Sequence, residues 1–327
     1  MLARKLMAAT GSHPMENWTT QNSGSDQDLN DVVWNGSIFV AVGNYGKIIT
    51  SSDGITWTSR TSGTTTSNFE KIYWLGGKFI AVGGADGGTM AVSSSYDGIY
   101  WNYSSGLPGG AFKYAAWNGT HYIIAGSSGN VWRSNDAVTW SYVTNLNLCR
   151  SLIYANSIFV LLTDTDIKTS TDGVTWTSRK SGTYLDITWA SYQFVAVGQN
   201  GAIATSSNGI NWSGMTSGTT VMLINVTYGD SLMVAGGQNG LILTSSNGGE
   251  TWAIRRAQDG VDIDNLKWLN NQYIGVRWNG GIIVSNDGIA WDSFQIVSET
   301  YMPLFGVTYG ASKYVVTGYN GKLLTHA

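Results

Sequence analysis

A short motif, Ser-x-Asp/Asn-Gly-x-x-Trp, recurs from one end of the chain to the other at intervals of about forty residues. Clear copies end at Trp57, Trp101 and Trp176, and further copies end at Trp140, Trp212, Trp252 and Trp291. Self-similarity at a fixed period of 20–50 residues is the signature of repeat architectures. The 327 residues are therefore predicted to form one repeat array and not two unrelated domains.

Two aromatic series give the number of repeats, and both have eight members. The first series is Trp18, Trp57, Trp101, Trp140, Trp176, Trp212, Trp252 and Trp291. The second series is Trp34, Trp74, Trp117, Tyr154, Trp189, Tyr228, Trp268 and Tyr309, each two residues after an apolar residue. The series account for most of the tryptophans as repeated packing positions, so the aromatic content calls for no cofactor.

Short β-branched and aromatic runs lie between the two series, for example Phe39-Val40-Ala41-Val42 and Phe194-Val195-Ala196-Val197. Such runs are typical of buried strands. Asn-Gly pairs that suit tight turns follow several of them. Each unit thus reads as a four-stranded meander, and repeated antiparallel meanders predict an all-β, eight-bladed β-propeller. Seven blades are the alternative, because the full motif occurs in only seven copies.

The two ends of the chain complete one another. The last unit stops at Leu324-Thr325, before its Trp-containing strand, and the segment around Trp18 has the sequence pattern of that missing strand. Residues 16–24 are therefore predicted to complete the last blade together with residues 302–327. The propeller then spans residues 16–327, and residues 1–15 form an N-terminal arm.

Composition excludes several classes of function. Charged residues are 12% of the chain and the formal net charge is -3, with no basic run, so we expect no nucleic-acid partner. No run of eighteen apolar residues occurs, so we expect no membrane insertion. His13, His121 and His326 have no metal-ligand spacing, and Cys149 is interpreted as a packing residue. We predict no metal and no cofactor.

The motif resembles the Asp-box of sialidase-like and related propellers, and the likeness covers nearly the whole chain. The copy that ends at Trp252 has the longer Asp-box spacing. The resemblance implies that the acidic or amide residue forms a turn while the Trp anchors the next strand. The turn residues are then Asp53, Asp97, Asp136, Asp172, Asn208, Asn247 and Asp287.

A sialidase would also need an arginine cluster that grips the substrate carboxylate. Arg60, Arg179, Arg255 and Arg256 instead follow the motif Trp, in predicted outer strands. Glycosidases in general need two convergent carboxylates, and Asp31, Glu70 and Asp186 lie near inner strands. These three come from different units, so we interpret them as channel-lining or solvated groups and predict no catalytic residues. Glycosidase activity is the alternative.

The segment Arg4-Lys5-Leu6-Met7 in the arm resembles the N-terminal peptide of a number of tailed-phage virion proteins. This resemblance implies a noncatalytic structural or interaction protein of the virion, made in the host cytoplasm. The arm would bind other virion proteins and the propeller would serve as a decoration, fibre or adsorption module. The first alternative is a propeller that binds or cleaves a host surface glycan. The second is an assembly factor resembling photosystem-associated propellers. The repeat is irregular near Gly84–Met90 and Thr163–Asp166, where a specific contact could arise.

Overall fold

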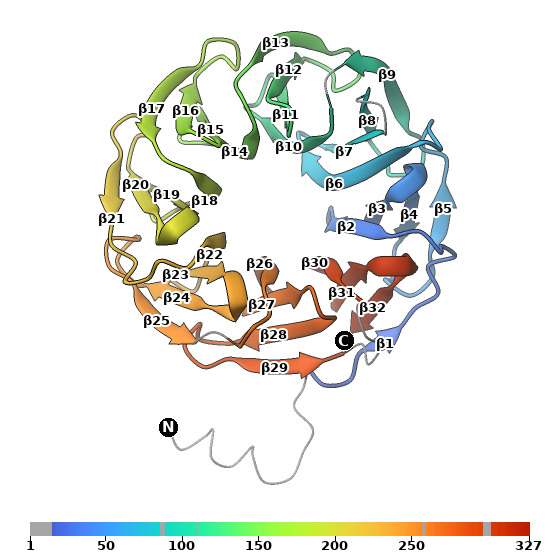
Figure 1. Cartoon of the computed structure of the whole chain (residues 1–327). Helices are drawn as coiled ribbons and strands as arrows, with labels where there is room; N and C mark the ends of the chain where they lie inside the picture. Colours follow the sequence, from blue (N-terminus) through green and yellow to red (C-terminus); the bar gives the residue numbers. More distant parts are fainter. Residues whose placement is uncertain (1–14, 86–88, 109, 257–258, 297–301) are drawn as a thin grey trace.

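The computed structural model describes residues 15–85, 89–108, 110–256, 259–296 and 302–327. These residues form eight four-stranded antiparallel sheets, arranged around a ring as the blades of a propeller with one strand of each at the centre (Figure 1). The prediction of an all-β, eight-bladed propeller is confirmed, and the seven-bladed alternative is wrong. The arm segment Arg4–Met7 lies outside the described residues.

The first four blades each run outward from the inner strand in sequence order. Blade 1 consists of β2 (Leu29–Trp34), β3 (Phe39–Gly43), β4 (Ile48–Ser51) and β5 (Thr58–Arg60). Blade 2 consists of β6 (Ser67–Leu75), β7 (Lys78–Ala85), β8 (Thr89–Ser95) and β9 (Asn102–Pro108). Blade 3 consists of β10 (Phe112–Trp117), β11 (Tyr122–Gly126), β12 (Asn130–Ser134) and β13 (Ser141–Asn145). Blade 4 consists of β14 (Cys149–Ala155), β15 (Ile158–Thr163), β16 (Asp166–Ser170) and β17 (Thr177–Ser181).

The next three blades repeat this order, and the last blade breaks it. Blade 5 consists of β18 (Tyr184–Ala190), β19 (Gln193–Gly198), β20 (Ile203–Ser206) and β21 (Ser213–Met215). Blade 6 consists of β22 (Leu223–Gly229), β23 (Leu232–Gly237), β24 (Ile242–Ser245) and β25 (Ala253–Arg256). Blade 7 consists of β26 (Ile263–Leu269), β27 (Gln272–Arg277), β28 (Gly281–Ser285) and β29 (Asp292–Gln295). Blade 8 consists of β30 (Leu304–Gly310), β31 (Lys313–Gly318), β32 (Leu323–His326) and the N-terminal β1 (Thr19–Thr20).

Four short 3-10 turns connect the second and third strands of their blades. They contain the Asn-Gly pairs or a related sequence, and they are η1 (Asn44–Gly46), η2 (Gln199–Gly201), η3 (Gln238–Gly240) and η4 (Tyr319–Gly321). In η2 the middle Asn200 and the following Gly201 both have positive φ, as a tight Asn-Gly turn requires.

The ring closes where β1 pairs with β32. Thr19 lies opposite Thr325 and Thr20 opposite Leu324. The Gln21 N–H donates to the Leu323 carbonyl at 2.8 Å, and the Gln21 side chain donates to Thr325 Oγ1 at 2.8 Å. The N-terminal segment therefore supplies the outer strand that the last unit lacks, as the sequence predicts.

Three aromatic rings recur in a fixed arrangement within most blades. A fully buried ring on the second strand contacts the aromatic of the inner strand on one side and the motif Trp on the other. In blade 1, Phe39 lies 4.3 Å from Trp34 and 6.1 Å from Trp57, measured between ring centroids. Blades 2, 4, 5 and 7 repeat this triad. In blade 6, Met233 occupies the central position.

Trp18 completes the triad of blade 8. Its ring lies 6.4 Å from that of Tyr314, which in turn lies 4.8 Å from Tyr309. The Trp18 Nε1–H donates to the Met15 carbonyl at 2.9 Å, just as Trp57 donates to the Gly54 carbonyl at 2.9 Å. Trp18 is thus the equivalent of the motif tryptophans, although no Ser-x-Asp-Gly precedes it.

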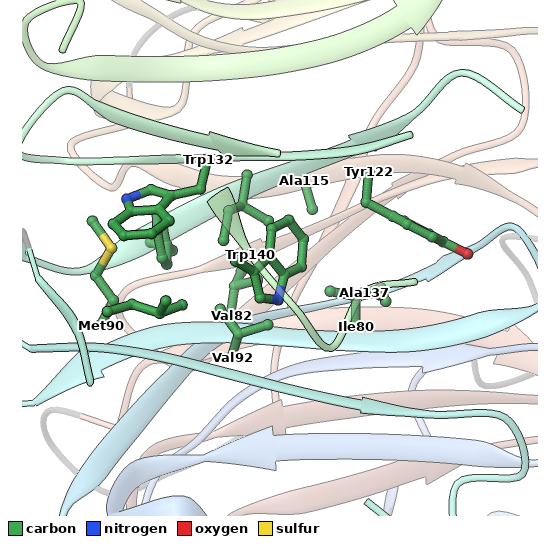
Figure 2. Packing of buried hydrophobic residues seen from close by; sticks show 12 residues of the cluster. Ile80, Val82, Met90, Val92, Ala115, Tyr122, Trp132, Ala137 and Trp140 are labelled. Carbon is green, nitrogen blue, oxygen red and sulfur yellow. The ribbon is translucent and has the colours of Figure 1, made fainter. Parts of the chain in front are cut away.

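The hydrophobic core lies between neighbouring blades. Figure 2 shows one such cluster, in which Ile80, Val82 and Val92 of blade 2 pack against blade 3 residues that include Tyr122 and Trp140. Met90, the last residue of the irregular part of the second unit, is buried beside Trp132 in the same cluster. The longer β7–β8 pair therefore adds to the core between blades 2 and 3.

We predict that Trp18→Ala destabilises the protein more than Trp57→Ala. Both side chains are half-buried and make the same hydrogen bond, so each truncation should cost roughly 2–4 kcal/mol in lost packing. Trp18 also holds the two-residue β1, so its loss opens the ring. Urea denaturation of both variants measures the difference. Equal losses of unfolding free energy would contradict the idea that Trp18 fastens the ring.

Candidate functional site

All eight inner strands carry a β-bulge at the same place. In β2 the register with β3 shifts between Leu29 and Asp31, and the other seven inner strands shift at the equivalent position. Residues three apart on a regular strand point to opposite faces. The bulge allows Leu29 and Val32 to be buried together. In blade 1 the polar residues Asn30 and Asp31 lie between them, at the bulge.

Asp31 and Asp186 each bind the inner strand of the next blade. Asp31 Oδ2 accepts from the Ile72 N–H at 3.2 Å, and Asp186 Oδ2 accepts from the Val226 N–H at 2.9 Å. Ser151 on the preceding blade donates to Asp186 Oδ1 at 3.2 Å. Both carboxylates therefore act as links between blades.

Other polar side chains of the inner strands make links of the same kind. Each donates to a backbone carbonyl one blade further along the chain, from blade 1, 2, 6 or 7. These hydrogen bonds, with the donor first, are Asn30 to Phe69 at 2.8 Å, Tyr73 to Lys113 at 2.7 Å, Asn225 to Ile263 at 2.7 Å, Asn265 to Phe305 at 3.2 Å and Lys267 to Val307 at 2.9 Å.

The three carboxyl residues considered for a glycosidase lie on three separate blades. Asp31 and Asp186 lie on blades 1 and 5, and each is held by the backbone of its neighbour. Glu70, on β6, forms an ion pair with Lys113 of blade 3 at 3.5 Å. All three residues lie on inner strands, and their observed contacts connect blades.

Burial changes the ionisation of several groups in this ring. It raises the pKa of Asp186 to about 6. Burial, helped by the nearby Asp262 carboxylate, raises the pKa of Asp264 to about 7. Burial also lowers the pKa of Lys267. All three shifts have the same cause, since a charge is disfavoured where little water reaches it.

The acidic residues of the repeated motif close its turns. Asp53 Oδ1 accepts from the Ile55 and Thr56 N–H groups at 2.8 Å each, and Ser51 Oγ donates to the same oxygen. Asp97, Asp136, Asp172 and Asp287 accept the corresponding pairs of N–H groups. The Thr56 N–H is the largest cause that lowers the pKa of Asp53 to about 2.

The motif tryptophans contact the same turns. Trp57, Trp101, Trp176, Trp212, Trp252 and Trp291 donate to the carbonyl three residues earlier, at 2.8–3.3 Å. Trp140 differs, because its Nε1 is buried and has no hydrogen-bond partner among the described residues. In that copy Ala137 stands where the others have Gly.

Three arginines on fourth strands form hydrogen bonds within the outer part of their own blades. Arg60, Arg179 and Arg255 each donate through Nε to a threonine on the third strand of the same blade, at 2.8 Å. Two arginines that the sequence analysis missed lie further inward. Arg277 is buried at the end of β27 and forms an ion pair with Asp259, and Arg150 lies on the inner strand β14.

Two further candidate residues, Cys149 and Asp166, are buried. Cys149 is buried, and burial raises the pKa of its thiol to about 12. Asp166, in the irregular fourth unit, pairs with Lys168 at 2.7 Å and accepts from Ser178 at 2.6 Å. Within the described ranges, no three His, Cys, Asp or Glu side chains are grouped as metal ligands would be. The described part of the chain also has no helix of the length and apolarity needed to cross a membrane.

The sequence matches no protein-family model, and no curated protein sequence matches it. Solved structures do resemble the fold. Saccharomyces cerevisiae Sqt1 is 13% identical with a TM-score of 0.74, covering 95% of this chain and 98% of that one. The C-terminal WD40 domain of Sif2 is 14% identical with a TM-score of 0.70, covering 93% and 97%. YCF48 bound to D1 peptide is 15% identical with a TM-score of 0.60, covering 98% of both chains. At such low identity these similarities establish the fold alone.

We predict that the protein loses stability as the pH rises from 4 to 7. Asp186 and Asp264 have raised pKa values, so the folded state holds more protons than the unfolded state in this window, and deprotonation favours unfolding. Each carboxyl should contribute a decline on the order of 1–3 kcal/mol. Urea midpoints measured from pH 4 to 8 should show this slope, and Asp186→Asn or Asp264→Asn should flatten it.

Asp53→Asn provides the control for this experiment. Because the pKa of Asp53 is lowered to about 2, this group stays ionised in both states over most of that pH range. Its substitution should leave the slope between pH 5 and 8 unchanged. An unaltered slope in both inner-strand variants would show that buried carboxyls near the centre of the ring do not control the pH response.

Proposed function

We propose that this chain is a noncatalytic interaction protein of a tailed-phage virion, with a propeller that docks protein partners and an N-terminal arm that anchors it. The observation that carries the noncatalytic part is the use of the inner-strand side chains. Asp31, Asp186 and Lys267 hold the backbone of neighbouring blades, so they are committed to the ring. The phage assignment rests on the resemblance of Arg4–Met7 to the N-terminal peptide of tailed-phage virion proteins.

The proposed docking surface lies where the repeated motif turns. Six copies of the motif place a β-branched aliphatic residue directly after the Gly or Ala, and each of these side chains is exposed, from 37% at Val138 to 49% at Ile289. We name this set the aliphatic crown: Ile55, Ile99, Val138, Val174, Ile210 and Ile289. The turn needs only the N–H of this residue, as at Ile55, so it does not require an apolar side chain.

The crown lies on one face of the ring, here named the motif face. The turns between first and second strands share this face, since Asn156 of blade 4 donates to the Ser207 carbonyl in the motif of blade 5 at 3.2 Å. Gln272 likewise donates to Asn286 in the motif of blade 7 at 2.7 Å. A partner that spans several blades would contact several members of the crown at once. A solved propeller of similar fold, YCF48, has a D1 peptide bound, which supports docking of protein segments to such a scaffold.

We predict that the variant Ile55→Ser, Ile99→Ser, Val138→Ser folds normally but is poorly incorporated into particles. Exposed substitutions usually change stability by less than about 0.5 kcal/mol each. Loss of apolar contact should lower incorporation about tenfold, which corresponds to about 1.4 kcal/mol of docking free energy. Quantitative immunoblotting of purified particles measures it. The control is Ile254→Ser, an equally exposed residue on outer strand β25. Equal incorporation of both variants would argue against the crown.

The arm has a separate test. We predict that deletion of residues 1–13 leaves the melting temperature unchanged and abolishes incorporation, because the deletion spares Trp18 and β1, which close the ring. A chain truncated through residue 22 serves as the control that should lose stability as well. Normal incorporation of the shorter deletion would refute anchoring by the arm.

A further inference from the structure

The opposite face of the ring exposes aromatic residues on three of its turns. We name it the Asn-Gly face, because it carries the turns between second and third strands. Three large apolar side chains are exposed on those turns: Tyr45 at 61%, Trp278 at 46% and Tyr319 at 40%. They belong to blades 1, 7 and 8, which are consecutive around the closed ring (Figure 1). We name this set the aromatic arc.

The arc breaks the repeat at each of its members. Trp278 and Tyr319 occupy the position that is Gln199 in blade 5 and Gln238 in blade 6. The turn itself therefore accepts a polar residue there. Aromatic rings on three consecutive blades are not a requirement of the fold.

Tyr45 is also held in an unfavourable backbone conformation. Its φ is 54°, in the left-handed region, where Asn200, Asn239 and Asn320 stand in the equivalent turns. Asn tolerates this region and a bulky residue does not. The Tyr45 N–H donates to Asn68 Oδ1 at 3.0 Å, which fixes the turn. The backbone of this turn therefore does not call for Tyr at this position.

Polar groups border the arc on its inner side. Trp278 packs edge-on against Phe305 of β30, with ring centroids 6.3 Å apart. At the same bulge position, blade 7 presents Asp264 and blade 1 presents Asn30. The buried Asp264 Oδ2 has no hydrogen-bond partner within the described residues. The Asn30 amide already donates to the Phe69 carbonyl and to Asn44, so the arc combines ring faces chiefly with the Asp264 carboxyl group.

We propose that the aromatic arc binds a neutral, extended oligosaccharide. Sugar rings present apolar C–H faces and hydroxyl edges, which suit flat amphipathic side chains flanked by hydrogen-bonding groups. Lys47 and Lys322 follow the turns of blades 1 and 8, but the Asp28 carboxylate lies between these turns and accepts from Asn44 and from the Asn320 N–H. The nearby Arg277 is buried and paired with Asp259, so the described charges around the arc are of both signs and favour a neutral ligand. A protein partner suits the motif face better, since the exposed aliphatic side chains gather there. This proposal rests on the proposed virion function. It adds the chemical class of the receptor that the propeller would bind.

An array of neutral bacterial cell-surface oligosaccharides, with acidic capsular oligosaccharides alongside, tests the proposal on the full-length protein. We expect binding to neutral members, and a loss of at least tenfold in Tyr45→Ala, Trp278→Ala and Tyr319→Ala. The matched control is Tyr192→Ala. Tyr192 is 88% exposed and also has positive φ, but it lies on the motif face. Its substitution should leave binding unchanged.

Tyr45→Asn separates a binding role from a structural one. It should raise the melting temperature, because Asn relieves the left-handed strain, and it should still weaken oligosaccharide binding. Absence of binding by the wild-type protein, preference for acidic members, or unaltered binding by the arc variants would overturn the proposal. Particle incorporation of the same variants should stay normal, so failure of this proposal is distinguishable from failure of the proposed virion role.

Discussion

The ring depends on one repeated contact, the packing of a buried aromatic on the second strand of a blade between two other rings. Phe39 is fully buried between Trp34 and Trp57. The glycine of the same motif approaches the preceding blade, since a Cβ on Gly54 would lie 3.4 Å from both Phe39 and Val315. The ring packing therefore holds the strands of one blade together. The motif glycine allows that blade to pack closely against its neighbour. Trp18 provides it for blade 8, so closure uses the same interaction as most of the other blades.

A second constraint acts at the centre, where the bulges leave polar groups with little water. Each unmet polar group there would cost roughly 1–3 kcal/mol. Many of these polar groups form hydrogen bonds to the next blade, as Asn225 does with the Ile263 carbonyl. Gly306 shows how little room remains, because a Cβ would lie 2.9 Å from the Asp31 Cα. The polar centre that resembles a site from sequence is therefore largely a set of links between blades.

The fold was predictable because its signals are periodic. Trp18 and Trp34 recur with their equivalents, and counting them gives eight blades even though the motif has seven copies. The centre was less predictable. Asp31 and Asp186 were placed near inner strands, but Lys267 and Asp264 were not, because the bulge changes which residues turn inward and leaves no distinct residue type behind. The bulge could have been located from the apolar-x-x-apolar spacing, as in Leu29 and Val32. The arc was missed because three isolated aromatics carry no period.

The two faces of the ring differ in a way that bears on function. Strand order places the motif turns on one face and the Asn-Gly turns on the other, so one repeat generates two independent surfaces. Residues that a turn does not constrain can then diverge separately on each. The motif face retains similar aliphatic side chains on six blades, which favours a partner that covers much of the ring. The Asn-Gly face exposes aromatic side chains on three consecutive blades, which favours a ligand that follows this arc. A module that must attach to a particle and still contact something outside it needs this separation of surfaces.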